Sequence, residues 1–195
     1  DSNIYFIFDE LNNDVTNNQI LIYFYRNTTH NIVSYELKKG HHYHISFEPY
    51  TIKYLSLILQ KGHIFVNHIN LIKYENPLTN KIKYQFQDQR INKIMDAAVA
   101  TFAQNAVDVL TDCPSRERAG WLCDSYFSGQ SEQLITGENK VEHNFLENYA
   151  LCPQFKNLPL NMIPMCYPSE CPDGVFIPNW AMFYVIELES YLRRT

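Results

Sequence analysis

The spacing of apolar residues changes once along the chain, near residue 75. Up to about Tyr74, short apolar and aromatic runs alternate with polar turns, which is typical of half-buried antiparallel strands. Their spacing of roughly ten residues predicts a β-sandwich. We expect the last two strands to form a hairpin across Lys61-Gly62-His63. The predicted strands are Ile4–Phe8, Ile20–Tyr25, Ile32–Leu37, His41–Phe47, Thr51–Gln60 and Ile64–Ile72.

Beyond Glu75-Asn76-Pro77 the apolar residues recur at helical spacing. The first helix is predicted from about Gln89 to Leu110, with Asp88 as its N-cap and Pro114 as the residue that ends it. Further helices are expected over about Cys123–Ile135, Asn139–Leu151 and from Asn179 to the end of the chain.

Two features of this helical half predict contacts beyond its own helices. The Pro-rich stretch from Pro153 to Pro178 is too long for an ordinary connection, so we expect it to be functional or to lie over a neighbouring part. The last helix carries large side chains around much of its circumference, so we expect it to be covered on more than one side. We infer that the helical half is incomplete as written and that its partner surfaces lie in more chain or in another subunit.

Composition narrows the class of protein. The chain has 195 residues, of which 46% are hydrophobic and 19% charged, enough apolar material for one or two folded domains. The formal net charge is −5 and no basic run could neutralise a row of phosphates, so we expect no nucleic-acid partner. No apolar run approaches the roughly 18 residues that span a bilayer. We therefore expect a soluble protein with no membrane partner, and its compartment stays open.

Ionisable groups concentrate in residues 112–124, which read DCPSRERAGWLCD and lie between the first two predicted helices. Loops held by rigid elements often carry binding and catalytic side chains. A plainer interpretation is that Asp112 caps a helix end, Glu117 pairs with a neighbouring arginine, and Trp121 belongs to the core. Composition alone does not choose between the two interpretations.

The run DCPSRERAGWLCD resembles the signature of the α-L-rhamnosidase family of inverting glycoside hydrolases. The flanking NAVDV at 105–109 and IPNW at 177–180 are similar to family segments as well. The resemblance implies a multi-domain α and β chain. Residues 1–76 would be an antiparallel β-sandwich domain lacking its N-terminal part, and residues 77–195 the first helical hairpins of an (α/α)6 six-hairpin barrel that is incomplete here. The chain would then be a central fragment of a longer enzyme.

The same resemblance implies that the function is release of terminal α-L-rhamnose from glycans or glycosides with inversion, and that Glu117 is the general acid. Neighbouring carboxylates disfavour the charged form of such a group, which suits a residue that must hold its proton near neutral pH. Carboxylates can accept hydrogen bonds from sugar hydroxyls, an arginine (116 or 118) can orient a substrate group, and a flat indole suits the C–H face of a sugar. The implied substrate contacts are Asp112, Arg116, Trp121, Asp124 and Trp180.

Inversion needs a second carboxylate, roughly 6.5–9.5 Å from the acid, that activates water. In the relatives this base comes from a later hairpin, so the resemblance implies that the remainder of the same enzyme, or a complementary chain, supplies it. Glu187 and Glu189 are downstream acids, but we expect a helix face near the chain end to be solvated surface. No cofactor is implied, because a proton donor and an activated water suffice.

Other interpretations stay open. A zinc site could draw on the cysteines, although no Cys-x-x-Cys pair occurs and we expect thiols packed as small apolar groups, with no metal. His42 and His44 share one face of a predicted strand, where exposed histidines are the more common case. The alternative function is a non-catalytic carbohydrate-binding or structural fragment of a rhamnosidase-like protein. The cysteines are Cys113, Cys123, Cys152, Cys166 and Cys171.

Overall fold

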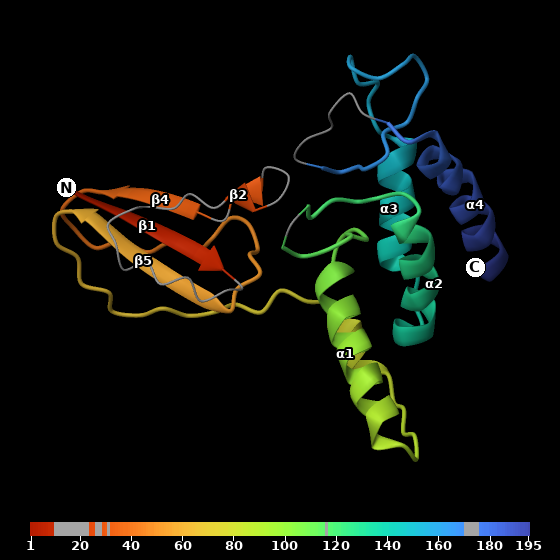
Figure 1. The fold of residues 1–195 in the computed structure, drawn as a ribbon, viewed down its shortest axis with the longest axis horizontal. Helices are drawn as coiled ribbons and strands as arrows, with labels where there is room; N and C mark the ends of the chain where they lie inside the picture. The colour runs from red at the N-terminus through yellow and green to blue at the C-terminus, as the bar shows by residue number, and fades with distance from the viewer. Residues whose placement is uncertain (10–23, 26–28, 31, 116, 170–175) are drawn as a thin grey trace. The chain divides into compact units, whose positions relative to one another are not determined.

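The computed structural model describes residues 1–9, 24–25, 29–30, 32–115, 117–169 and 176–195. The chain divides into two compact units, Asp1–Lys73 and Tyr74–Thr195. Within the described residues, the first unit contains the strands and the second contains the helices (Figure 1).

The first unit contains a three-stranded antiparallel sheet with the order β4-β1-β5. In this sheet β1 is Ser2–Asp9, β4 is Ile32–Leu37 and β5 is Tyr54–Lys61. A separate two-stranded ladder pairs β2 (Phe24–Tyr25) with β3 (Thr29–His30).

Apolar cross-strand contacts account for the register of the three-stranded sheet. Ile4 of β1 lies opposite Tyr35 of β4 and Leu59 of β5, and only 2% of its surface is exposed. Phe6 packs edge-on against Tyr35, with ring centroids 5.4 Å apart. Pairs of this kind are the main stabilising contacts between neighbouring strands. The central position of β1 follows from its apolar side chains on both faces.

Four of the six predicted strands overlap strands of the structure, and two predictions were wrong. Ile4–Phe8 falls within β1, Ile32–Leu37 coincides with β4, and Thr51–Gln60 overlaps β5. Of Ile20–Tyr25, residues 24–25 form β2 and residues 20–23 lie outside the described residues.

His41–Phe47 and Ile64–Ile72 are not strands, and the hairpin expected between β5 and residues 64–72 is therefore wrong as well. The backbone groups of β5 pair with β1 instead. Side chains such as Phe65, which is 96% exposed, have no packed face to join. An apolar pattern without a backbone partner does not make a strand.

The second unit contains four α-helices among its described residues, preceded by the short 3₁₀ helix η1 (Pro77–Lys81). Three of the predicted helices match to within a few residues at each end. The helices are α1 (Gln89–Asn105), α2 (Asp124–Thr136), α3 (Lys140–Ala150) and α4 (Pro178–Arg194).

The helix ends follow from local sequence. Asp88 is the N-cap of α1, as predicted, and its carboxylate accepts a hydrogen bond from the Arg90 amide at 2.9 Å. Gly137 ends α2 in the left-handed conformation with φ 74°, which glycine adopts without steric cost. Pro178 begins α4, where its missing N–H is of no consequence.

The prediction that α1 continues to Leu110 was wrong. The helix ends at Asn105, and the Thr111 amide returns to donate to the Asn105 carbonyl at 2.9 Å. Ala106 and Leu110 then pair in an isolated β-bridge, and both are buried in the core. The spacing of these two apolar residues continues the helical pattern, but both residues lie in a turn that folds back and packs into the core.

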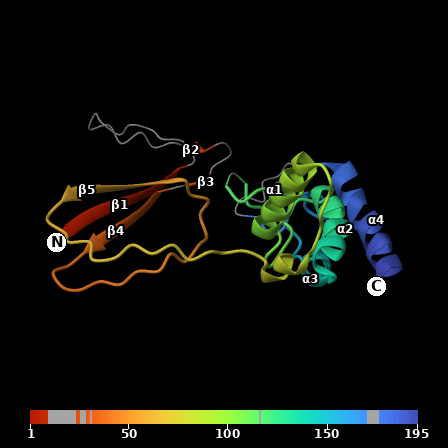
Figure 2. The same ribbon diagram turned by 90° about the horizontal axis from the view of Figure 1, so that it is seen from below.

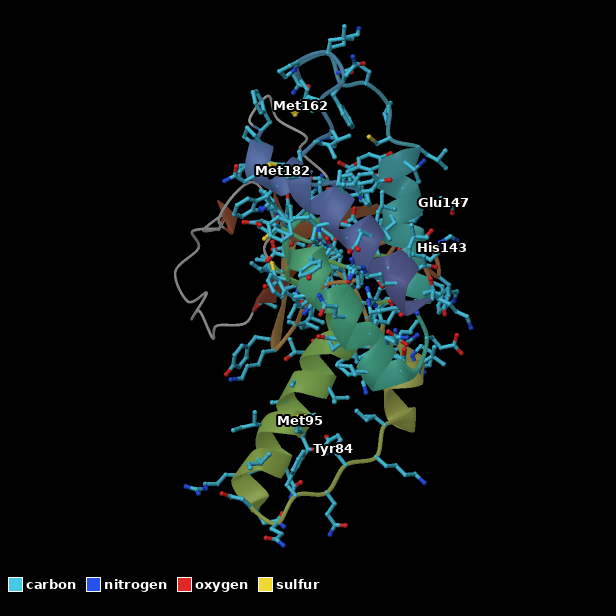
Figure 3. The ribbon with its side chains drawn as sticks, turned by 90° about the vertical axis from the view of Figure 1, so that its right-hand side faces the viewer. Tyr84, Met95, His143, Glu147, Met162 and Met182 are labelled. Atoms are coloured by element: carbon cyan, nitrogen blue, oxygen red, sulfur yellow. The ribbon has the colours of Figure 1, made fainter. Side chains whose placement is uncertain are left out.

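The segment before α1 folds back along that helix. Tyr84 donates a hydrogen bond to Asp96 at 2.5 Å, and the Phe86 backbone exchanges two hydrogen bonds with the Asn92 side chain. Figure 3 shows Tyr84 beside Met95 of α1. The side chains of α1 thus fix its own N-terminal approach.

The core of the second unit is formed by the turn after α1, by Leu122 and by one face of α3. Helix α2 contacts α1, α3 and α4, and Figure 2 shows it between α1 and α4. The outer face of α4 stays exposed, including Met182, labelled in Figure 3, and Leu192. The buried cluster consists of Ala106, Val109, Leu110, Leu122, Val141, Phe145, Leu146 and Tyr149.

Within the described part of the chain, no helix has the length and apolar character that crossing a bilayer requires.

Candidate active site

Within the loop that joins α1 to α2, two hydrogen bonds between Asp112 and Ala119 close a turn. The Asp112 amide donates to the Ala119 carbonyl at 3.0 Å, and the Ala119 amide donates to the Asp112 carboxylate at 3.1 Å. Inside this closure the Glu117 amide donates to the Cys113 sulfur at 3.4 Å. Glu117 is half-buried. Asp112 therefore shapes the turn that carries Glu117.

The second half of the loop is fixed by the Pro-rich stretch. The Gly120 amide donates to the Pro168 carbonyl at 3.0 Å, and the Tyr167 amide donates to the Gly120 carbonyl at 2.8 Å. The Leu122 amide donates to the Met165 carbonyl at 3.1 Å. The expectation that this stretch lies over a neighbouring part is confirmed for residues 165–168.

Gly120 is required by this close approach. A Cβ atom at that position would lie 2.5 Å from the Tyr167 carbonyl oxygen and 2.9 Å from the Phe145 ring. The buried Tyr149 hydroxyl of α3 also donates to the Gly120 carbonyl, at 2.7 Å. Two segments that are distant in sequence, the Pro-rich stretch and α3, thus converge on one glycine of the loop.

Asp124 is the first residue of α2 and is exposed. Desolvation raises the pKa of its carboxyl group, and the negative charge of Asp112 raises it further. That electrostatic interaction means that the loop brings Asp112 and Asp124 near one another. Two of the three predicted carboxylates thus interact electrostatically, and the third, Glu117, lies on the turn that Asp112 closes.

Two residues of this loop adopt backbone conformations that side chains disfavour. Arg118 has φ 47°, and Cys123 has φ 79° with ψ −55°. Strain of this kind persists where surrounding contacts determine the conformation, and it concentrates at functional sites.

The remaining predicted substrate contacts are placed as follows. Arg116 lies outside the described residues. Trp121 is half-buried, and its indole N–H is buried with no hydrogen-bond partner among the described residues. Trp180, near the start of α4, is half-buried and packs against the core cluster. Contact of any of these side chains with a sugar stays a prediction.

The described residues contain few features that favour a metal site on the cysteines or on the histidines. No group of three or more His, Cys, Asp or Glu side chains there is arranged to hold a metal ion. Burial raises the thiol pKa values of Cys123 and Cys152, which disfavours the thiolates that zinc needs. Cys171 lies outside the described residues. His42 and His44 stack with ring centroids 6.0 Å apart, in a segment that is not a strand.

The expectation that Glu187 is solvated surface was wrong. Its side chain is fully buried between α4 and α2, and Ser125 donates a hydrogen bond to Glu187 Oε2 at 2.5 Å. Burial raises the pKa of Glu187 to about 7, with a smaller contribution from the charge of Glu142. Glu189 is exposed and pairs with Arg193, as a surface residue should.

The sequence contained a sign of this burial. Tyr184, Leu188 and Tyr191 of α4 pack against the core, and position 187 falls on the same helical stripe. An acidic residue on an apolar stripe indicates a buried, partnered carboxyl group.

Two more buried glutamates lie on α2 and α3, and sequence reasoning missed both. Glu132 of α2 accepts hydrogen bonds from the amides of Val141 and Glu142 at 2.9 and 2.8 Å, and so caps the start of α3. Glu142 of α3 accepts a hydrogen bond from Arg194 of α4 at 2.5 Å. Gly129 makes room for Glu142, because a Cβ atom there would overlap the carboxyl group.

Comparison with known proteins identifies the class of the helical unit as a glycosidase domain. Residues 83–194, more than half of the chain, match the model of the bacterial alpha-L-rhamnosidase 6 hairpin glycosidase domain. The chain therefore belongs to the bacterial α-L-rhamnosidase family, and the resemblance drawn from residues 112–124 is confirmed. Searches of curated proteins and of solved structures found no match.

Proposed function

We propose that the enzyme to which this chain belongs releases terminal α-L-rhamnose from glycans or glycosides with inversion at the anomeric carbon. Family membership makes the protein a glycoside hydrolase-like protein with a glycan as its substrate class. The finer statement, rhamnose and inversion, is supported by the acidic loop 112–124 and its match to the family motif.

The roles in this proposal follow from the loop. Glu117 is the general acid that protonates the departing glycosidic oxygen. Asp112 and Asp124 accept hydrogen bonds from the sugar hydroxyls. The observation that carries the proposal is the closed loop, in which Asp112 holds the turn of Glu117 while its charge acts on Asp124.

Arg116, Trp121 and Trp180 complete the substrate contacts in the proposal. The indole N–H of Trp121, which is buried and has no partner among the described residues, is a donor that a sugar hydroxyl could satisfy. The general base comes from a later hairpin, in the remainder of the same enzyme or a complementary chain. It activates a water on the opposite face of the sugar.

The domain assignment belongs to the same proposal. Residues 1–76 form part of a β-sandwich domain, and residues 77–195 form the first hairpins of an (α/α)6 barrel. Exposed apolar side chains on the outer face of α4, such as Met182, Val185 and Leu192, are covered by the remaining hairpins.

The test uses the full-length protein that carries this sequence and an aryl α-L-rhamnoside. We expect release of the aryl alcohol, with β-rhamnose as the first sugar product in proton NMR spectra. First appearance of α-rhamnose would contradict inversion. Rhamnose binding without release would support the alternative of a non-catalytic carbohydrate-binding fragment, and neither binding nor release would contradict the proposal altogether.

A further inference from the structure

The buried hydrogen bond between Ser125 and Glu187 joins two helices that are far apart in sequence. Ser125 is 1% exposed and Glu187 is fully buried, and the bond between Ser125 Oγ and Glu187 Oε2 is 2.5 Å long. A hydrogen bond to a buried carboxyl group is among the stronger ones that a protein makes. This bond ties the first turn of α2 to the middle of α4.

Ser125 directly follows Asp124, one of the proposed sugar ligands. Its amide also donates to the Trp121 carbonyl at 3.1 Å. The backbone and the side chain of Ser125 are therefore both held, the first by the acidic loop and the second by Glu187. A shift of Ser125 would move Asp124 with it, because the two residues share a peptide bond.

Packing alone does not explain a glutamate at position 187. A buried carboxyl group loses its hydration, and an apolar side chain of similar size would often be more stable there. Glu187 Oε1 and Glu142 Oε2 are both buried without a hydrogen-bond partner among the described residues. The position therefore carries an energetic cost that a purely structural residue would avoid.

We propose that Glu187 is a positioning residue of the glycosidase site, which holds the start of α2 through Ser125 and thereby orients Asp124 toward the sugar. This inference rests on the function proposed above. Glu187 does not touch the substrate in this account and acts only through Ser125.

The surroundings of Glu187 are consistent with a fixed acceptor rather than a free acid. Glu142 and Tyr149 face it from α3, and Tyr184 and Arg194 face it from α4. Glutamine at position 187 would keep the volume and an oxygen that accepts the Ser125 hydrogen bond. Leucine would keep the volume and remove the acceptor.

The experiment compares four variants of the full-length enzyme on an aryl α-L-rhamnoside: Ser125→Ala, Glu187→Leu, Glu187→Gln and, as the exposed control on the same helix, Glu189→Gln. We expect Ser125→Ala and Glu187→Leu to lower kcat/KM by about tenfold to a hundredfold, since small displacements of a binding group have effects of that size. Part of this decrease in kcat/KM should come from a higher KM. Glu187→Gln and Glu189→Gln should stay close to wild type.

The KM separates positioning from simple loss of stability. A destabilised but correctly built enzyme has fewer active molecules, which lowers the apparent kcat and leaves KM unchanged. An unchanged KM in both Ser125→Ala and Glu187→Leu, or failure of Glu187→Gln to restore activity, would overturn the inference. An inert wild-type enzyme would instead overturn the proposed function, and this inference with it.

Discussion

The second unit holds acidic residues in two regions that differ in almost every physical respect. In the loop before α2, Asp112, Glu117 and Asp124 are half-buried or exposed, and they lie within a short stretch of sequence. In the interior between α2, α3 and α4, three glutamates are fully buried, each on a different helix. They are Glu132, Glu142 and Glu187.

In the roles that we propose, the loop carboxylates meet the substrate, and the interior Glu187 sets the position of one of them. The loop carboxylates can exchange water for sugar hydroxyls. The interior carboxylates are occupied by helix amides, a serine hydroxyl and an arginine. Substitutions in the two regions, with the exposed Glu189 of α4 as a reference, should therefore differ in the kind and size of their effects.

The largest expected effect comes from Glu117→Gln in the loop. Loss of a general acid lowers the rate by about a hundredfold to ten-thousandfold. The loss should be greatest for rhamnosides with a poor leaving group and small for dinitrophenyl rhamnoside, which needs no proton. Steady-state kinetics on a series of aryl rhamnosides measures this.

Asp124→Asn is the matched comparison, because a sugar ligand should lower kcat/KM by a similar factor across the whole series. A Glu117→Gln defect that does not depend on the leaving group would contradict its role as the acid.

In the interior, Glu187 should make stability depend on pH. Its pKa is about 7 in the folded protein against an ordinary 4.5. Between these values the folded protein holds a proton that the unfolded chain has lost, so this stabilisation is complete below pH 4.5 and is lost as the pH rises through about 7. The full loss corresponds to roughly 3 kcal/mol.

Denaturant unfolding at several pH values, for wild type and Glu187→Gln, measures the contribution as the difference between the two slopes. The burial of Glu132 raises its pKa too, so the slope of the variant should shrink and not vanish. Equal slopes for the two proteins would show that Glu187 does not titrate in this range.

Glu132→Gln should lower the free energy of unfolding by about 2 kcal/mol. The glutamine amide replaces one of two acceptor oxygens and leaves one buried N–H at the start of α3 unpaired, which costs this amount. Glu138→Gln, near the surface before the same helix, serves as the control in urea titrations. A stability equal to wild type would mean that Glu132 does not cap α3.

The smallest expected effect is that of Glu189→Gln. Its partner Arg193 is exposed, and surface ion pairs of this kind contribute about 0.5 kcal/mol or less. Thermal melting should place the variant within the error of wild type. A larger loss would mean that Glu189 makes stabilising contacts beyond its ion pair with Arg193.

The parts of the fold that depend on residues adjacent in sequence could be predicted from the sequence. Helices α2, α3 and α4 begin and end near Pro178, Gly137 and similar markers, because capping is decided within a turn of chain. Local sequence could not show that residues 41–47 and 64–72 are not strands, since a strand needs a backbone partner from elsewhere in the chain.

The candidate site likewise has a part that could be predicted from the sequence and a part that could not. The acidic loop was found because its residues are contiguous and resemble a family motif. The contacts of the loop with Tyr149 and with residues 165–168, and the burial of Glu187 against Ser125, were not predicted, since tens of residues separate the partners. The Pro-rich stretch itself was expected to be functional or to lie over a neighbouring part, but without a named partner. Only the place of Glu187 on the apolar stripe of α4 indicated its burial.

The backbone conformation at Cys123 makes this position a target for stabilising substitutions. Its φ of 79° favours glycine, and a side chain there costs about 1–2 kcal/mol. Cys123→Gly is therefore an attractive choice in a thermostabilisation library. The same exchange would let the chain rotate between the tryptophan of the loop and the start of α2, so gains in heat resistance at this position should be accepted only with turnover measured beside them.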